Sequence, residues 1–368
     1  MDNILTFFLL RVLVVCITLI CCFQYSKDTS KKVFLFAPIL VISLNEGLRF
    51  GRGIDYNVYY FTYRDIISGF DVRANEPLFI ALCKFNDFLG FPYQGLVYLM
   101  SLILIVSGVL YLRNHKSVIL LALPLFMVFT FDAENLMRWF TAFSFLLIGV
   151  SYLEQDKVKK YILFVIIAFL FHSGIVVVAP IFFALHYVKK PLLNPLLSCG
   201  IYLFIYFFFK TRFMLNFVQY MNVFSGMTQF SGYVENADEW LTGTANFVAQ
   251  KLNIGVVIMD LFIIIIGYKV LKYKPQLTYL YNLCLLGTVL SPALYQIEIL
   301  YRICLLFKLF QFLIIAYAVY FFINLRRSSI VYVVLTWIII LNLIRIHVFN
   351  ILIEPYTSNS YLYVWDKM

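Results

Sequence analysis

Residues 93–131 read YQGLVYLMSLILIVSGVLYLRNHKSVILLALPLFMVFTF, in which two apolar runs, 93–112 and 118–131, flank a short polar turn. A helix needs about 20 apolar residues to cross a membrane, so the first run predicts a span and the second a tilted or broken one. The turn carries Arg113 and Lys116, and basic residues in short loops mark the cytoplasmic side. The stretch therefore predicts two membrane helices joined on the inner face.

The rest of the 368-residue chain repeats this pattern. Hydrophobic residues make up 63% of it and charged residues 13%, with a mean hydropathy of +0.89, which excludes a soluble globular domain. We predict an all-α, polytopic integral membrane bundle of about 12 transmembrane helices with broken or re-entrant segments. The remaining apolar runs are 4–23, 33–48, 139–153, 161–171, 174–187, 192–209, 251–268, 276–296, 300–323 and 330–349.

The basic residues predict the orientation of the chain. Basic clusters follow every second run, at 27–32, 113–116, 157–160, 189–190, 269–274 and 326–327. This alternation predicts both termini outside, cytoplasmic loops too short for a nucleotide-binding domain, and large outer segments at 49–92 and 210–250. The net charge of +10 therefore reports topology and not a nucleic-acid partner. We expect a single transmembrane domain over 1–368, in which the first run is a retained anchor and not a signal peptide.

Residues 49–76 read RFGRGIDYNVYYFTYRDIISGFDVRANE and hold four arginines and no lysine. Positive charge is scarce in outer loops, whereas the planar guanidinium fork suits phosphate or carboxylate. The segment predicts a tyrosine-lined pocket for an anionic, sugar-bearing ligand, followed by an interfacial helix at 76–90. The alternative is a solvated loop whose arginines contact lipid headgroups or internal acids. The predicted ligand-binding side chains are Arg49, Arg52, Arg64, Arg73, Tyr56, Tyr59 and Tyr60.

Two carboxylate–guanidinium pairs recur at the same spacing, Glu134 with Arg138 and Glu298 with Arg302. A glutamate four residues before an arginine is the favourable order for an ion pair on one helix face. Such pairs either steady helix ends or belong to a shared site at the outer mouth of the bundle. Their position beside the arginine-rich segment favours the shared site.

Three ionisable residues interrupt apolar runs. His172 lies in the sequence LFHSG, where we expect two short antiparallel helices to meet, and ionisable groups at broken helices often mark functional sites. The alternative is a structural histidine with hydrogen bonds to its neighbours. Asp260 and Lys308 would each be costly alone in hydrocarbon. They could pair with one another, either as a structural ion pair or as part of an ion-coupled transport path.

Two further outer segments hold candidate ligand contacts. Segment 210–250 mixes polar residues, glycines and aromatic residues, and we expect it to fold over the outer mouth and shape a specificity pocket. The tail 351–368 is expected to lie along the membrane interface through its aromatic residues. The candidate sugar contacts in the first segment are Arg212, Tyr233, Glu235, Asp238, Glu239 and Trp240.

Familiar catalytic signatures do not occur in the sequence. There is no Walker A loop, GxGxxG, HExxH, paired CxxC or GxSxG motif, so ATP-driven, dinucleotide-dependent and zinc-peptidase chemistry have no support. The seven cysteines show no paired spacing, which argues against a disulfide framework or a metal site. We expect neither a metal nor another cofactor.

The order and spacing of five short motifs resemble the EpsG-like branch of the Wzy-type polysaccharide polymerases over most of the chain. At Trp139 the chain departs from the family pattern, which usually has glutamine after the arginine. The motifs are LRFGRGIDYNVYY at 48–60, EPLF at 76–79, NLMRWFTAFSFLL at 135–147, FLFHSG at 169–174 and LYRICLLF at 300–307.

The resemblance implies a bacterial inner-membrane enzyme whose active site faces the periplasm or the outside. Its substrates would be oligosaccharide repeat units on undecaprenyl pyrophosphate, and undecaprenyl pyrophosphate would be released. Arginines suit a leaving diphosphate without a metal. We expect a pyrophosphate clamp of Arg52, Arg138 and Arg302, support from Arg49 and Arg73, and Asp55 or His172 as the base. Beyond membrane lipids, the expected protein partners are a flippase and a chain-length regulator.

Three other activities remain open at this stage. A flippase or transporter of lipid-linked oligosaccharides predicts function-critical charges at mid-membrane, such as Asp260 and Lys308. A polyprenyl-phosphate-sugar glycosyltransferase predicts acids in the first outer loop, where Asp55, Asp65 and Glu76 lie, and a requirement for a divalent metal. An O-antigen ligase differs from the polymerase in its acceptor.

Overall fold

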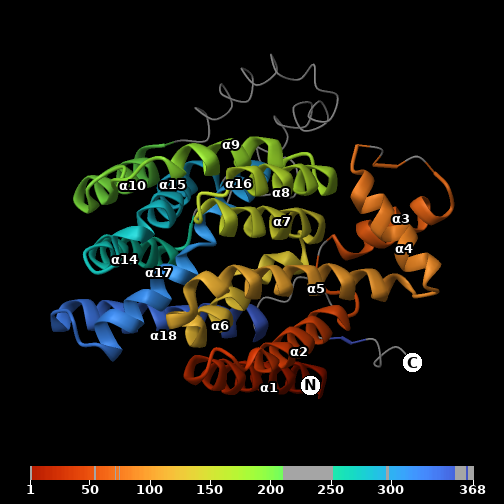
Figure 1. Cartoon of the computed structure of the whole chain (residues 1–368), viewed down its shortest axis with the longest axis horizontal. Helices are drawn as coiled ribbons and strands as arrows, with labels where there is room; N and C mark the ends of the chain where they lie inside the picture. Colours follow the sequence, from red (N-terminus) through yellow and green to blue (C-terminus); the bar gives the residue numbers. More distant parts are fainter. Residues whose placement is uncertain are drawn as a thin grey trace, which may run out of the picture. The chain divides into compact units, whose positions relative to one another are not determined.

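The computed structural model describes residues 2–53, 55–70, 72–73, 75–209, 252–295, 298–352 and 362–363. Regular structure in these residues is helical, apart from one isolated bridge between Arg49 and Tyr363. The chain forms two compact units, Met1–His186 with Leu343–Met368, and Tyr187–Asn342 (Figure 1). The prediction of one transmembrane domain over the whole chain stays a prediction.

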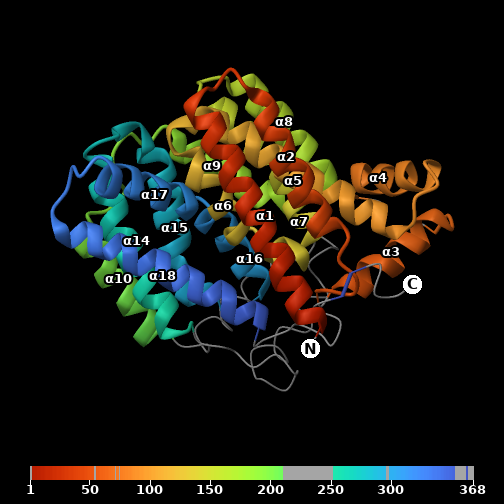
Figure 2. The same cartoon turned by 90° about the horizontal axis from the view of Figure 1, so that it is seen from below.

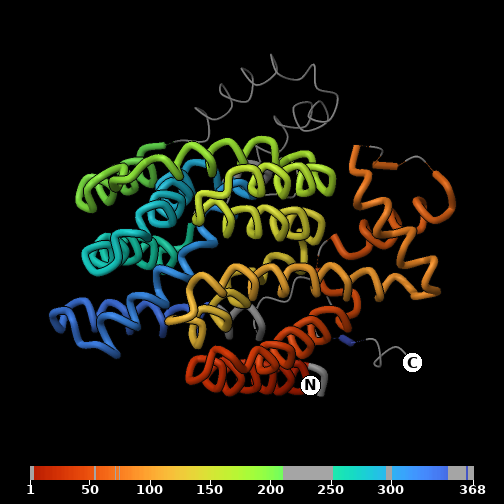
Figure 3. Tube along the Cα trace, viewed as in Figure 1, coloured from red at the N-terminus to blue at the C-terminus, as the bar shows by residue number. Residues whose placement is uncertain are grey.

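The first unit consists of nine α-helices in its described residues. They are α1 (Asp2–Lys27), α2 (Phe36–Gly47), α3 (Tyr56–Ile67), α4 (Pro77–Phe88), α5 (Tyr93–Leu112), α6 (Ile119–Phe129), α7 (Met137–Leu153), α8 (Val158–Phe171) and α9 (Ile175–His186). Helix α1 packs on α2 and α6, α2 packs on α5, α5 on α7, and α7 on α8, in the layered order seen in Figures 1 and 3. Close packing requires Gly47, because a Cβ there would lie 2.7 Å from the Cα of Tyr98.

Local backbone features set the ends of these helices. At His115 the φ and ψ angles of −123° and 39° leave the helical region and separate α5 from α6. His172 is extended, with φ −157° and ψ 116°, and ends α8 before α9 begins. The predicted break at residues 172–174 is therefore confirmed.

The second unit contains the other described helices, and α18 continues from it into the first. They are α10 (Pro195–Phe208), α14 (Ile254–Leu271), α15 (Thr278–Leu294), α16 (Glu298–Lys308), α17 (Gln311–Ala318), a π-helix (Val319–Asn324) and α18 (Ile330–Leu352). The predicted pair is present: Lys308 Nζ lies 2.8 Å from Asp260 Oδ2, with both side chains buried. Tyr202 and Gln311 also donate hydrogen bonds to the Asp260 carboxylate, so the buried charge is stabilised by three donors, including Lys308.

Each predicted apolar run contains at least one helix, which supports a multi-pass membrane protein. Five described helical stretches are long and apolar enough to cross a membrane. The expected number of about 12 spans is not confirmed, because several of the other apolar helices are shorter. The five stretches are Ile4–Lys27, Tyr93–Phe129, Ile254–Leu271, Pro275–Leu294 and Tyr301–Asn324.

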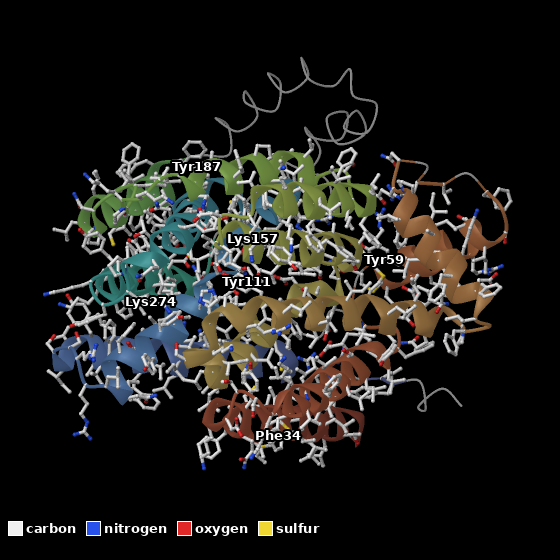
Figure 4. The ribbon with its side chains drawn as sticks, viewed as in Figure 1. Phe34, Tyr59, Tyr111, Lys157, Tyr187 and Lys274 are labelled. Carbon is white, nitrogen blue, oxygen red and sulfur yellow. The ribbon has the colours of Figure 1, made fainter. Side chains whose placement is uncertain are left out.

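The two ends of the first unit differ in chemistry. Tyr111 and Lys157 lie at one end of α5 and α7, and Tyr59 lies toward the other end (Figure 4). The lysines of the turns at 27–32, 113–116 and 157–160 are exposed, as expected for solvated loops. The opposite end carries the α3–α4 hairpin and the loop that follows α2 (Figure 2). Of its arginines, Arg49 and Arg52 are buried, whereas Arg64 and Arg73 are exposed.

Candidate functional site

The loop between α2 and α3 turns inward at two glycines. Gly51 and Gly53 have φ angles of 67° and 103°, a region that side chains with a Cβ rarely adopt. A Cβ on Gly53 would lie 2.9 Å from the carbonyl oxygen of Glu134. The loop can therefore approach the turn before α7, and both Arg49 and Arg52 are only 2% exposed.

These arginines meet the buried Glu134, the partly buried Glu46 and a third arginine. Arg52 Nε lies 2.9 Å from Glu134 Oε2, and Arg49 donates through Nη2 to the Glu134 carbonyl at 2.9 Å. Arg11, in α1, donates to the Glu134 carboxylate and lies 3.1 Å from Glu46 Oε1. We call Arg11, Glu46, Arg49, Arg52 and Glu134 the arginine–glutamate cluster. Arg49 and Arg52 thus contact acids of the protein itself. The sequence left two possibilities for these arginines, ligand binding and contact with internal acids, and the structure shows the second for this pair.

Burial perturbs the pKa values of two cluster residues that lie outside the membrane-spanning helices, Glu134 and Arg52. Removal from water raises the pKa of Glu134, opposed by the positive charge of Arg52 and increased by the negative charge of Glu46. Removal from water also lowers the pKa of Arg52, opposed mainly by Glu134. Both pKa shifts show that the ionisation of these two side chains is governed by neighbouring charged residues and not by water.

Gln94 and Tyr363 fasten the loop from two sides. Gln94 Nε2 donates to the carbonyls of Gly47 and Arg49. The Tyr363 hydroxyl donates to Asn45 Oδ1 at 2.8 Å, and this tyrosine is 1% exposed. Of the tail's aromatic residues, Tyr363 is buried against the loop, whereas Tyr361 and Trp365 lie outside the described residues. That the tail lies along the membrane interface stays a prediction.

A cavity of about 40 Å³ lies inside the first unit beside the cluster. Four cluster residues line one end, all except Arg52, and apolar side chains of α5, α6 and α7 line the rest. This volume suits a few water molecules and is far below the several hundred Å³ of a usual ligand site. A cavity of this volume has no room for a sugar or a lipid headgroup.

A second group of charged residues collects at the start of α7. Arg138 forms an ion pair with Glu76, the residue before α4. Its guanidinium lies over the rings of Tyr59 and Phe79, each 5.4 Å away. His172 Nε2 lies 3.9 Å from Glu76 Oε1. We call Glu76, Arg138 and His172 the Glu76 site; three segments far apart in sequence build it.

The hydrogen bonding of His172 fixes its role. Its Nδ1 accepts from the backbone N–H of Gly174 at 3.1 Å, so in the neutral ring the proton is on Nε2, the nitrogen that faces Glu76. Trp139 packs edge-on against the imidazole, with ring centroids 5.0 Å apart. A Cβ on Gly174 would lie 2.8 Å from Trp139, so the glycine permits this contact. The nitrogen that carries the proton in the neutral ring therefore faces Glu76, at a distance beyond that of a hydrogen bond.

Glu76 is well placed to exchange a proton. Its carboxylate is 4% exposed, and burial raises its pKa, opposed by the positive charges of Arg138 and Arg73. The side chain of His172 remains 28% exposed. The Glu76 site therefore combines a buried carboxylate of raised pKa with a partly exposed imidazole.

The prediction that Glu134 and Arg138 pair on one helix face is wrong. Glu134 ends a 3-10 turn, Phe131–Glu134, and α7 begins only at Met137. Glu134 turns to Arg11 and Arg52, whereas Arg138 turns to Glu76. For the second predicted pair, Glu298 begins α16 and its side chain lies outside the described part, and Arg302 belongs to the second unit.

The other predicted ligand-binding residues divide between buried and exposed positions. Tyr56 and Tyr59 are buried, whereas Tyr60, Arg64 and Arg73 are exposed. The Tyr56 hydroxyl donates to Gln94. The backbone N–H of Asp55 donates to Asn135 Oδ1. The candidates in 210–250 lie outside the described residues.

Sequence reasoning did not single out Arg11 or Glu46, and it named Glu76 only as an outer-loop acid that would suit the glycosyltransferase alternative. Arg11 had a usable signal, because an arginine within a long apolar helix needs a buried partner. Glu46 and Glu76 flank the arginine-rich segment, but their partners are set by the fold and not by spacing.

Replacement of Gly53 by alanine is expected to destabilise the first unit by about 1–3 kcal/mol, because the new Cβ meets the Glu134 backbone at a left-handed position. Gly69→Ala is the matched control, since Gly69 also has a positive φ of 88° but a Cβ added there would meet nothing within 4 Å. Thermal unfolding of both variants in detergent measures the difference. Equal loss in the two variants would contradict the close approach.

A family model described as the EpsG family matches residues 32–358. Searches of curated proteins and of solved structures found no match. The matched segment contains the whole Glu76 site and four of the five cluster residues, whereas Arg11 and Tyr363 lie outside it.

Proposed function

Because the chain belongs to the EpsG family, we propose that it is a polysaccharide polymerase that joins oligosaccharide repeat units carried on undecaprenyl pyrophosphate. The reaction takes place at the extracytoplasmic face of a bacterial inner membrane. It uses the end of the first unit opposite the exposed lysine turns. No metal is needed for the chemistry proposed below.

The observation that carries the proposal is the convergence of Glu76, Arg138 and His172. A carboxylate, a guanidinium and an imidazole from three segments meet at a partly exposed point. Glycosyl transfer from a diphosphate needs a base for the acceptor hydroxyl and positive charge for the leaving group. These three side chains supply both kinds of group.

In the proposed step, a hydroxyl oxygen of the incoming repeat unit attacks the anomeric carbon of the growing chain. The bond from that carbon to the diphosphate oxygen breaks, and undecaprenyl pyrophosphate leaves with the bonding electron pair. The hydroxyl proton passes to the Glu76 carboxylate. The proposal thus moves the role of base from Asp55 or His172 to Glu76, since His172 Nδ1 already accepts a hydrogen bond and its Nε2 carries the proton.

Arg138 offsets negative charge on Glu76 and on the departing diphosphate, and exposed Arg73 approaches the same anion from solvent. His172 contributes its Nε2–H to a diphosphate oxygen. Arg49 and Arg52 hold the loop between α2 and α3 through their contacts with Glu46 and Glu134. Exposed Tyr60 and Arg64 are the predicted sugar contacts of the hairpin.

The test is reconstitution of the purified protein with a synthetic repeat unit on a polyprenyl diphosphate, in the presence of EDTA. We expect a ladder of longer lipid-linked products and release of polyprenyl diphosphate. A requirement for a divalent metal would favour a polyprenyl-phosphate-sugar glycosyltransferase. Transfer of the lipid-linked unit across vesicles without any ladder would favour a flippase, for which the buried Asp260–Lys308 pair is the relevant observation.

A further inference from the structure

Arg49 is a buried cation whose hydrogen bonds go to neutral groups. Its Nη1 donates to the Glu46 carbonyl at 3.1 Å, and its Nη2 donates to the Glu134 carbonyl at 2.9 Å. Its ion pair is long, with 3.9 Å between Nη1 and Glu46 Oε2. Backbone carbonyls therefore hold the side chain in place, while its positive charge, removed from water, has no close counter-ion among the described residues.

The other charges of the arginine–glutamate cluster are already paired. Glu134 contacts Arg11 and Arg52, and Glu46 lies 3.1 Å from Arg11. Three arginines thus face two glutamates, which leaves an excess of one positive charge when both acids are ionised. This excess falls on Arg49, the arginine that is bonded to carbonyls.

The acid nearest in sequence to the cluster, Asp132, does not supply the missing negative charge. It is not part of the wall of the cavity beside the cluster. Loss of contact with water raises the pKa of its carboxyl to about 6, and no described arginine opposes that rise. A carboxylate close to an arginine would have its pKa lowered instead.

The cavity of about 40 Å³ adjoins the uncompensated charge. Arg11 and Arg49 both line it, and the Nε of each is buried without a hydrogen bond in the described part of the chain. The hydroxyl groups of its wall, those of Ser101, Thr130 and Thr141, donate to helix carbonyls. The donors left for an occupant are therefore arginine N–H groups, and most of the remaining wall is apolar.

The size and the charge of this space select its occupant. The volume suits a few water molecules or an ion of similar size. Water leaves the excess charge in place, and a cation is repelled by it. A phosphate-type oxyanion is larger and needs more directed donors than two Nε–H groups supply. A monatomic anion offsets the charge, needs few donors and fits the volume.

We propose that this cavity binds one chloride ion, which accepts hydrogen bonds from the Nε–H groups of Arg11 and Arg49. Arg11 belongs to α1 and Arg49 to the loop after α2, so the ion links two segments and stabilises the first unit. Glu46 and Glu134 line the same end of the cavity, but their charges are engaged by Arg11 and Arg52. The site is separate from the Glu76 site and does not depend on the proposed function.

The experiment measures equilibrium binding of radiolabelled chloride to the full-length protein in detergent, after exchange into sodium gluconate. We expect one saturable ion per chain, displaced by bromide and not by phosphate at equal ionic strength. Chloride should also raise the midpoint of thermal unfolding by at least about 2 °C relative to gluconate, because a ligand of the folded protein stabilises it. Arg49→Gln removes the excess charge and should abolish both effects.

The matched control is Arg64→Gln, which also removes one arginine but from an exposed position in α3, and should leave chloride binding unchanged. If Arg49→Gln does not stay monodisperse, Leu104→Phe fills the cavity from α5 without a change of charge and should abolish binding.

Four results would overturn the chloride site. They are no saturable binding in the parent protein, binding that survives a folded cavity variant, displacement by phosphate as strong as by bromide, and an equal loss in Arg64→Gln. None of these measurements requires polymer formation, so a failure of the polymerase function would leave them unaffected.

Discussion

Glu76→Gln is expected to lower the rate of polymer formation by about 100- to 10,000-fold, the usual contribution of a positioned general base. The amide keeps the size of the side chain but cannot take the proton of the acceptor hydroxyl. The ladder from a synthetic lipid-linked repeat unit, measured at equal protein concentration, reports the rate. Asp87→Asn is the matched control. Asp87 lies on α4, the helix that begins directly after Glu76, is exposed, and its variant should retain full activity.

The same assignment gives a pH dependence with a definite sign. A base works when it is deprotonated, so the rate should fall as the pH drops through the pKa of Glu76. Burial raises that pKa above its usual value, so the fall should begin at a higher pH than an exposed glutamate would give. Glu76→Gln should lack this acidic limb. A variant that keeps both the parent rate and the parent pH profile would remove Glu76 from the chemistry.

Glu76→Gln also weakens the ion pair that holds Arg138, so a loss of activity needs a check on folding. Chromatographic behaviour and thermal unfolding in detergent provide it. Arg138→Lys keeps the charge but loses the planar fork, and should reduce polymer formation while the protein stays folded. Activity that tracks unfolding across these variants would indicate a structural role for the pair.

Glu134→Ala should have the largest effect on stability, a loss of about 3–5 kcal/mol, because it leaves buried cations without their main partner. Its carboxylate contacts both Arg11 and Arg52, and Glu46 would remain as the acid of the cluster. Chemical unfolding in detergent measures the loss. Asp65→Ala removes an exposed carboxylate from α3 and should change stability by less than about 0.5 kcal/mol.

Removal of a buried arginine should restore part of the stability that Glu134→Ala loses. Glu134→Ala/Arg52→Met takes away one acid and one arginine, so it is expected to be more stable than Glu134→Ala alone. Losses that simply add in the double variant would show that the two side chains do not interact. Near-parent stability of Glu134→Ala would show that the arginines do not depend on this carboxylate.

The sequence predicted the helices well because their signal is local. Apolar runs of sufficient length and the basic turns between them are visible without knowledge of the fold, and the polar triplet at 172–174 marked the boundary between α8 and α9. The Asp260–Lys308 pair was also predictable, since each charge needs a partner in an apolar surrounding.

The partners within the site were harder to predict because they are distant in sequence. The spacing of Glu134 and Arg138 suggested a pair, but the helix starts between them and directs the two side chains to different neighbours. Arg49 and Arg52 looked like exposed ligand contacts, yet the turns at Gly51 and Gly53 carry them inward. Such outcomes depend on which helices pack together, and composition does not contain that information.

The bridge between residues 49–50 and 362–363 has a consequence for biogenesis. Tyr363 leaves the ribosome only after all of the second unit, whereas the loop that it binds is made near the start of synthesis. The helices α1 to α9 are therefore made before this bridge can form. A nascent chain arrested within the second unit would lack the bridge, and only the finished chain can fasten the loop between α2 and α3 from this side.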